Sequence, residues 1–186
     1  MDIVRKLTGR DVPVLVDPTL LLSDVEWCSI EMRPDWYRDE KYILNYFLGD
    51  VPQVLDELAK EHNYKIYNLM DADNLNLYTS RVEEFLWLID HAELVCTDSF
   101  HACVFSIIFN TSFVVVKRQQ KGMADMTSRL DTLLGLFCYQ NRLIDFVKIT
   151  IKADELLHMD SSKVKDIQKR EIARSTVFLK KAMKME

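Results

Sequence analysis

The sequence lacks any apolar run that approaches the ~20 residues needed to cross a membrane as a helix. Residues 1–6 lack the apolar core of a signal peptide, and the chain contains no internal repeat and no low-complexity linker. A surplus of positive charge is missing too: 24 basic residues stand against 29 acidic ones, and the formal net charge of -5 argues against a nucleic-acid partner or an anionic membrane surface. These absences leave a globular protein, which we expect in the cytoplasm; peripheral attachment at the inner face of the membrane stays open.

Metal-ligand spacing is also missing. The four cysteines stand at positions 28, 96, 103 and 138, without the close pairs of a metal site. We expect free, buried thiols in a reducing compartment. Residues 70–80 are rich in Asp and Asn, which predicts a loop, but they do not follow the spacing of a calcium-binding loop. The sequence therefore predicts no metal ion and no cofactor.

What remains is an ordinary globular composition, with 48% hydrophobic and 28% charged residues in a chain of 186. A chain of this length buries roughly 70% of the surface that it exposes when unfolded. We expect a single Rossmann-like α/β domain over residues 1–186. Residues 1–11 form its lead-in, and residues 153–186 form one or two C-terminal helices.

Strand-like and helix-like segments alternate along the chain. The expected strands are residues 12–16, 42–48, 64–69, 94–97, 112–116 and a short edge at 142–144. The expected helices are a short one opening with the capping box of Ser23 and Glu26, then residues 51–63, 82–92, 100–109 and 126–137. Most of the strands are too apolar to alternate, which is typical of a parallel sheet covered by helices on both faces.

The stretch 94–109 reads as a buried strand, a polar turn and a helix. The turn is Thr97-Asp98-Ser99, three residues that all favour the N-cap position. A helix that begins there directs its free N–H groups and the positive end of its dipole toward the carboxyl edge of the sheet, which suits an anion. His101, in the first turn, could donate to a phosphate or carboxylate or exchange a proton with a reacting group. The alternative is a capped helix whose histidine binds no ligand.

Ligands of parallel sheets bind beyond the carboxyl ends of the strands. Three polar strand ends are therefore expected to converge: Gly49-Asp50, Asp98-Ser99-His101 and Lys117-Arg118. The two cations could pair with a phosphate or carboxylate, and Gly49 would let a ligand approach the backbone closely. Each could also be an ordinary strand end.

Two further residues have open roles. Arg129 stands at a helix start, where it could clamp an anion or form a structural salt bridge. Asp17 precedes Pro18 and Thr19, and we expect it to cap their turn rather than to act in catalysis. The other histidines lie in polar, helical contexts and are expected at the surface: His62, His91 and His158.

Several short motifs, in this order, resemble the C-terminal half of the polysaccharide pyruvyl transferase family. The most specific is Thr97-Asp98-Ser99-Phe100-His101, and Asp17-Pro18-Thr19 supports it. The other matching segments are residues 16–22 with Trp27, 42–49, 84–92, 105–109 and 128–134. The resemblance spans roughly residues 12 to 142.

This resemblance implies a glycosyltransferase-B-like fold of two Rossmann-like halves with the active site between them. It implies transfer of a pyruvyl group from phosphoenolpyruvate, the donor substrate, to a hydroxyl of an exopolysaccharide, cell-wall glycan or lipid-linked sugar. It places His101 at the donor, and we expect His101 and Asp98 to be catalytic. The expected substrate-binding residues are Ser99, Phe100, Gly49, Lys117, Arg118 and Arg129.

Two features depart from the family pattern. Ala102 stands where members commonly have a glycine, which places a methyl group where the backbone approaches the ligand. The chain also has almost none of the family's N-terminal half, so we expect either a fragment or a shortened gene product, and a homo-oligomer or a partner chain could supply the missing half. The alternatives are a non-catalytic remnant, a nucleotide-sugar-binding half-domain of a glycosyltransferase, and a purely structural module.

Overall fold

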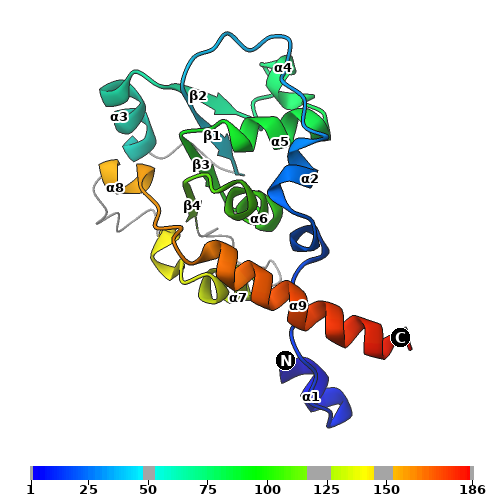
Figure 1. Cartoon of the computed structure of the whole chain (residues 1–186). Coiled ribbons are helices and arrows are strands. Elements are labelled where there is room, and N and C mark those ends of the chain that lie inside the picture. Colours follow the sequence, from blue (N-terminus) through cyan, green and yellow to red (C-terminus); the bar gives the residue numbers. More distant parts are fainter. Residues whose placement is uncertain (1, 48–52, 117–126, 145–152, 185–186) are drawn as a thin grey trace.

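A computed structural model describes residues 2–47, 53–116, 127–144 and 153–184 (Figure 1). Within these residues, five strands form one sheet in the order β2-β1-β3-β4-β5, and every pairing is parallel. The strands are β1 (Tyr42–Tyr46), β2 (Lys65–Asn68), β3 (Leu94–Thr97), β4 (Phe113–Val116) and β5 (Leu143–Ile144). The expected Rossmann-like α/β arrangement is confirmed.

Helices surround this sheet. The N-terminal ones are α1 (Asp2–Thr8), η1 (Pro18–Leu21), α2 (Asp24–Cys28), α3 (Gln53–His62), α4 (Leu75–Tyr78) and α5 (Val82–Asp90). They are followed by α6 (Phe100–Phe109), α7 (Thr127–Leu136), η2 (Gln140–Arg142), α8 (Ala153–Leu157) and α9 (Val164–Ala182). No helix among the described residues combines the length and the apolar character that crossing a membrane would require.

The two faces of the sheet carry separate cores because side chains alternate along each strand. Leu44 of β1 points into the larger core, which is built with α5, α6 and α7. Its neighbour Ile43 points into the smaller core, which contains residues of α3 and α8. Residues 102–108 of α6 are all buried, so this helix is packed on every side except at its start.

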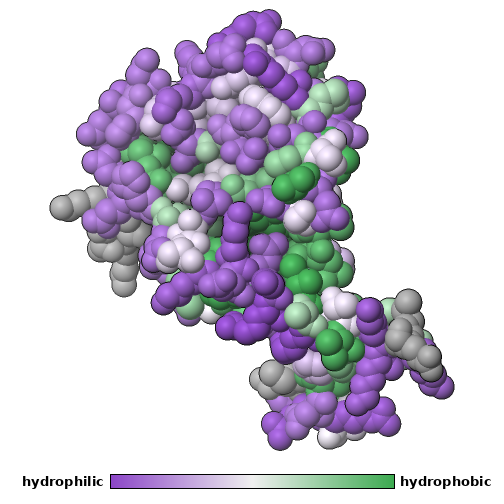
Figure 2. Space-filling view, in the orientation of Figure 1, coloured by the Kyte–Doolittle hydropathy of each residue, from purple (hydrophilic) through white to green (hydrophobic). Residues whose placement is uncertain are grey.

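The outer surface is largely hydrophilic in the view of Figure 2. Apolar side chains are exposed along the side that carries η1 and α2 (Figure 2), where Leu21, Leu22, Val25 and Ile30 are all exposed. Figure 1 shows α1 and the C-terminal end of α9 extending away from the sheet.

Three expectations about local structure are wrong. Residues 12–16 are not a strand, because the backbone of Val16 bonds to the Ser175 side chain instead of a neighbouring strand. The polar segment 70–80 contains the short helix α4. Two of the four cysteines, Cys28 and Cys138, are exposed rather than buried, since each stands at or after the end of a helix.

Candidate functional site

The strand order places a topological switch point between β1 and β3. From β1 the chain moves outward to β2 through α3, and from β3 it moves to the opposite side, to β4, through α6. Because α3 and α6 cover different faces of the sheet, the carboxyl ends of β1 and β3 are where a ligand is expected to bind in such a sheet.

Thr97 holds these two strand ends together. Its side chain is buried, and its hydroxyl donates to the carbonyl of Tyr46, at 2.6 Å, across the β1–β3 boundary. The same hydroxyl accepts the backbone N–H of Ser99 at 3.0 Å. Ser99 then caps α6 by accepting the N–H of Ala102 at 3.4 Å. The polar turn thus aims the start of α6 at the switch point, and its next free N–H groups have no acceptor within the helix.

His101 lies on the open side of this helix start. Its side chain is 53% exposed, so the imidazole is not packed into a core. Its Nε2 atom lies 3.8 Å from Oδ2 of Asp17, whose side chain is only 16% exposed. The ring also contacts Phe100 edge-on, with centroids 5.5 Å apart. His101 therefore has one anionic neighbour and a surface open to solvent.

Arg129, at the start of α7, lies over the same Phe100 ring that His101 contacts. Its guanidinium carbon is 4.3 Å from the centre of the Phe100 ring, a cation–π contact. Within the part of the chain that the structure describes, no carboxylate forms an ion pair with Arg129. The structural salt bridge that the sequence left open is therefore not found among the described residues.

The predicted site residues fall into three groups. His101, Ser99, Phe100 and Arg129 meet at the start of α6. Asp98 directly precedes Ser99 in the chain and is buried, with 6% of its surface exposed. The others, Gly49, Lys117 and Arg118, lie outside the described residues.

Asp17 is a site residue that sequence reasoning missed. It does cap the turn at η1, as expected, because its Oδ1 accepts the N–H of Thr19 at 3.0 Å and also the hydroxyl of Thr19. The structure adds the approach of its second oxygen to His101. The only signal in the sequence was that both residues belong to the motifs that carry the family resemblance.

Asn45 is a second polar residue that the sequence did not single out, because it stands within an apolar strand. It is fully buried near the carboxyl end of β1. Its Nδ2 donates to Oδ1 of Asn68 at 3.2 Å, and that oxygen also accepts the N–H of Met70. The orientation of the Asn45 amide is thereby fixed, and its Oδ1 has no hydrogen-bond partner among the residues that the structure describes.

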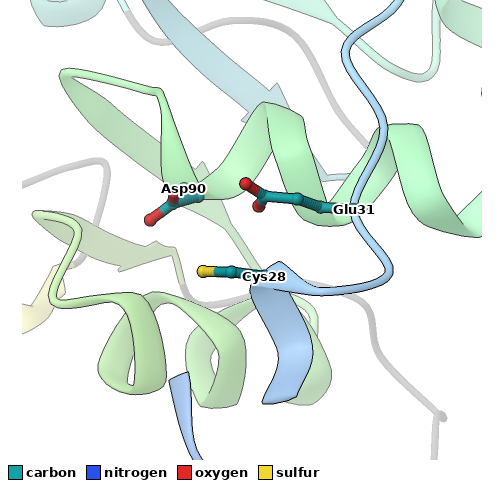
Figure 3. A group of neighbouring side chains, drawn as sticks. All are labelled: Cys28, Glu31 and Asp90. Atoms are coloured by element: carbon teal, nitrogen blue, oxygen red, sulfur yellow. The ribbon is translucent and has the colours of Figure 1, made fainter. Parts of the chain in front are cut away.

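A different cluster of polar groups lies at the amino end of the sheet (Figure 3). Ligand atoms of Cys28, Glu31 and Asp90 all lie within 4.8 Å of one another. Partial burial is the main cause that raises the pKa of all three groups. Nearby negative charges raise the pKa of the Cys28 thiol and of the Glu31 carboxyl further. A second, more exposed group of this kind consists of Glu61, His62 and Asp154. Either group has donors of the type that a divalent cation uses.

Taken together, the start of α6 combines two basic side chains, an aromatic ring between them and free backbone N–H groups. Such an arrangement suits a small anion. His101 adds a group that could move a proton to or from whatever is bound.

Comparison with known proteins gives one match. A family model described as "Polysaccharide pyruvyl transferase" matches residues 2–120, which is more than half of the chain. The matched residues include Asp17, the strands β1 to β4 and the turn with His101, and they end before Arg129. The resemblance drawn from residues 128–134 thus lies beyond the matched region. No curated protein and no solved structure matches the chain.

Proposed function

Because the chain belongs to the polysaccharide pyruvyl transferase family, we propose that it binds phosphoenolpyruvate at the start of α6 and takes part in pyruvyl transfer to a sugar hydroxyl of a glycan. The observation that carries this proposal is that two basic side chains, His101 and Arg129, both contact Phe100 at the switch point.

The chemistry of the donor fits these groups. Phosphoenolpyruvate carries a phosphate and a carboxylate, and both are ligands for a guanidinium and for the N–H groups of a helix start. In the proposed binding mode, Arg129 and the first N–H groups of α6 hold one of these anionic groups. The cation–π contact with the Phe100 ring holds the guanidinium at the start of α6.

His101 serves the transfer step in this proposal. Pyruvyl transfer needs a proton on the methylene carbon of the donor, addition of sugar hydroxyls to the adjacent carbon, and departure of inorganic phosphate. An imidazole can give the proton to the carbon or stabilise the leaving phosphate. Asp98, Ser99, Gly49, Lys117 and Arg118 stay predicted site residues.

Binding of phosphoenolpyruvate to the full chain, measured by calorimetry, tests the proposal. We expect binding at millimolar concentration or tighter, and His101→Ala and Arg129→Ala should each weaken it roughly tenfold, the typical effect of losing a charge-assisted hydrogen bond. His158→Ala is the matched control, because His158 is an exposed histidine outside this site; it should bind as the wild type does.

Two results would overturn the proposal. One is that the wild type does not bind millimolar phosphoenolpyruvate. The other is that the chain binds a nucleotide sugar while phosphoenolpyruvate does not compete, which would favour a nucleotide-sugar-binding half-domain.

A further inference from the structure

The backbone just before Asp17 is fastened to α9, a helix that lies beyond the residues matched by the family model. The N–H of Val16 donates to the Ser175 hydroxyl at 3.2 Å, and the guanidinium of Arg174 donates to the carbonyl of Val14 at 2.7 Å. Figure 1 shows the N-terminal segment passing alongside α9. Two consecutive residues of α9 therefore set the path of the chain into the Asp17 turn.

The fastening is well supported on the α9 side. Ser175 is 1% exposed and Glu171 is 7% exposed, so both are parts of the packed interior. Glu171 accepts from Arg174 at 2.8 Å and from Arg170 at 3.1 Å. Arg174 is thus held between a buried carboxylate and the backbone of residue 14, whereas Arg170 has the carboxylate contact alone among the described residues.

Asp17 follows this anchored segment directly, and its two carboxylate oxygens have separate partners. Oδ1 is taken by the N–H and the hydroxyl of Thr19, which leaves Oδ2 to face Nε2 of His101. At 3.8 Å the two atoms are within the range of an ion pair and beyond that of a direct hydrogen bond. The effect of Asp17 on the imidazole is therefore electrostatic and depends on where the turn is held.

We propose that Asp17 is a positioning residue for His101 and that α9, through Arg174 and Ser175, holds it in place. A carboxylate beside Nε2 favours the form of the imidazole that carries hydrogen on that nitrogen. Nδ1 is then the nitrogen left to act on a bound molecule. This inference rests on the proposed function only in assigning that molecule, because the state of the imidazole can be measured without any ligand.

The test is the tautomer of His101, read from the ¹⁵N chemical shifts of its ring in long-range proton–nitrogen spectra of the full chain. A pH near 8 keeps ordinary imidazoles mostly neutral. The chain has four histidines, and the His101→Ala spectrum assigns the signal. We expect mainly the Nε2–H form in the wild type. Asp17→Asn, which can keep the turn while removing the charge, should shift the tautomer ratio toward Nδ1–H by about twofold or more.

The His101 tautomer ratio, measured in variants of α9, distinguishes a specific effect on the position of Asp17 from a general disturbance of the fold. Arg174→Ala and Ser175→Ala should shift the His101 ratio in the same direction as Asp17→Asn does, and by less. Arg170→Ala is the matched control, since Arg170 shares Glu171 but makes no described bond to residues 14–16; it should leave the His101 signal unchanged.

An unchanged ratio in Asp17→Asn would overturn the inference, and so would an equal shift in Arg170→Ala and Arg174→Ala. Failure of the proposed function has a different signature. In that case phosphoenolpyruvate does not bind, while the ligand-free spectra still respond to Asp17→Asn.

Discussion

The two ends of the sheet differ in their polar side chains: the carboxyl end has basic groups next to the Asp17 carboxylate, whereas the cluster at the amino end is acidic. At the carboxyl end, His101 and Arg129 bring basic groups to the start of α6. At the amino end, Asp90, which is the last residue of α5, lies together with the acidic groups of Glu31 and Cys28 (Figure 3). In a parallel α/β fold the helices begin at the carboxyl end of the sheet and finish at the amino end, so their dipoles present positive charge at one end and negative charge at the other.

This difference shows why the carboxyl end is the better place for an anion. There, the basic side chains and the helix dipole act in the same direction. At the amino end, carboxyl groups stand at a helix C-terminus and are partly buried, and the pKa values of Glu31 and Asp90 are raised. Groups of that kind give up their charge easily or need a cation, and neither property helps to bind phosphate.

At the carboxyl end, Thr97→Val should have the largest effect on stability. The substitution keeps the shape of the side chain but leaves the carbonyl of Tyr46 and the N–H of Ser99 without their buried partner. We expect a loss of about 2–4 kcal/mol in the free energy of unfolding, measured by urea denaturation. Thr132→Val is the control, because its hydroxyl bond to Ser128 is exposed; it should cost less than about 0.5 kcal/mol. Equal losses would contradict the role given to Thr97.

A smaller effect is expected from removing helix caps. Ser99→Ala removes the cap of α6, and Ser23→Ala removes the capping box of α2. Each should lower the free energy of unfolding by about 1 kcal/mol. Only Ser99→Ala should also weaken phosphoenolpyruvate binding, measured by calorimetry, because only that cap fixes the helix start at the switch point. Weaker binding in Ser23→Ala would show that the caps act through overall stability.

At the amino end, Glu31→Gln should raise the free energy of unfolding, whereas the substitutions described so far lower it. Burial raises the pKa of Glu31 in the folded chain, so the folded state binds that proton more tightly than the unfolded state does. Stability is therefore lost as the pH rises from the ordinary pKa of a glutamate through the raised one. The variant should be more stable than the wild type by about 0.5 kcal/mol at neutral pH, and the advantage should vanish below pH 4.

Urea denaturation at several pH values checks this expectation. Glu155→Gln, at an exposed position on α8, is the matched control and should show no such gain. A gain that persists unchanged in acid would mean that the effect does not come from the charge of Glu31.

The smallest expected effect is on the reactivity of Cys28. Although Cys28 is exposed as a whole residue, partial burial first, and then the charges of Glu31 and Asp90, raise the pKa of its thiol. Glu31→Gln should lower that pKa and speed alkylation by iodoacetamide at neutral pH about twofold. Mass spectrometry of the labelled peptides gives the rate, and the exposed Cys138 in the same sample is the internal control. A change that is equal at both cysteines would point to general loosening of the chain.

The part of the site that could be predicted is the part that is local. The run from Leu94 to Phe109 predicted β3, a polar turn and α6, and the structure confirms each of them. Ser99 was one of three candidate caps, and the choice among them was left to the fold. In the same way the capping box at Ser23 follows from neighbouring residues.

The errors concern segments whose structure depends on distant partners. Residues 12–16 have the apolar, β-branched composition of a strand, but a strand needs a neighbouring strand to accept its backbone bonds. Here those bonds go to side chains of α9. The pairing of Asp17 with His101 and the burial of Asp98 likewise depend on how η1 and α6 pack.

By itself the sequence determined the five strands of the sheet, their parallel arrangement, the start of α6 and the family. These follow from periodicity, caps and motifs, whose physical causes act within one or two turns of the chain. Only the tertiary structure decided that Arg129 lies over Phe100, that Asp17 faces His101, and that acids gather at the opposite end of the sheet. Such contacts join residues far apart in the chain, and their distances are set by packing that no local pattern contains.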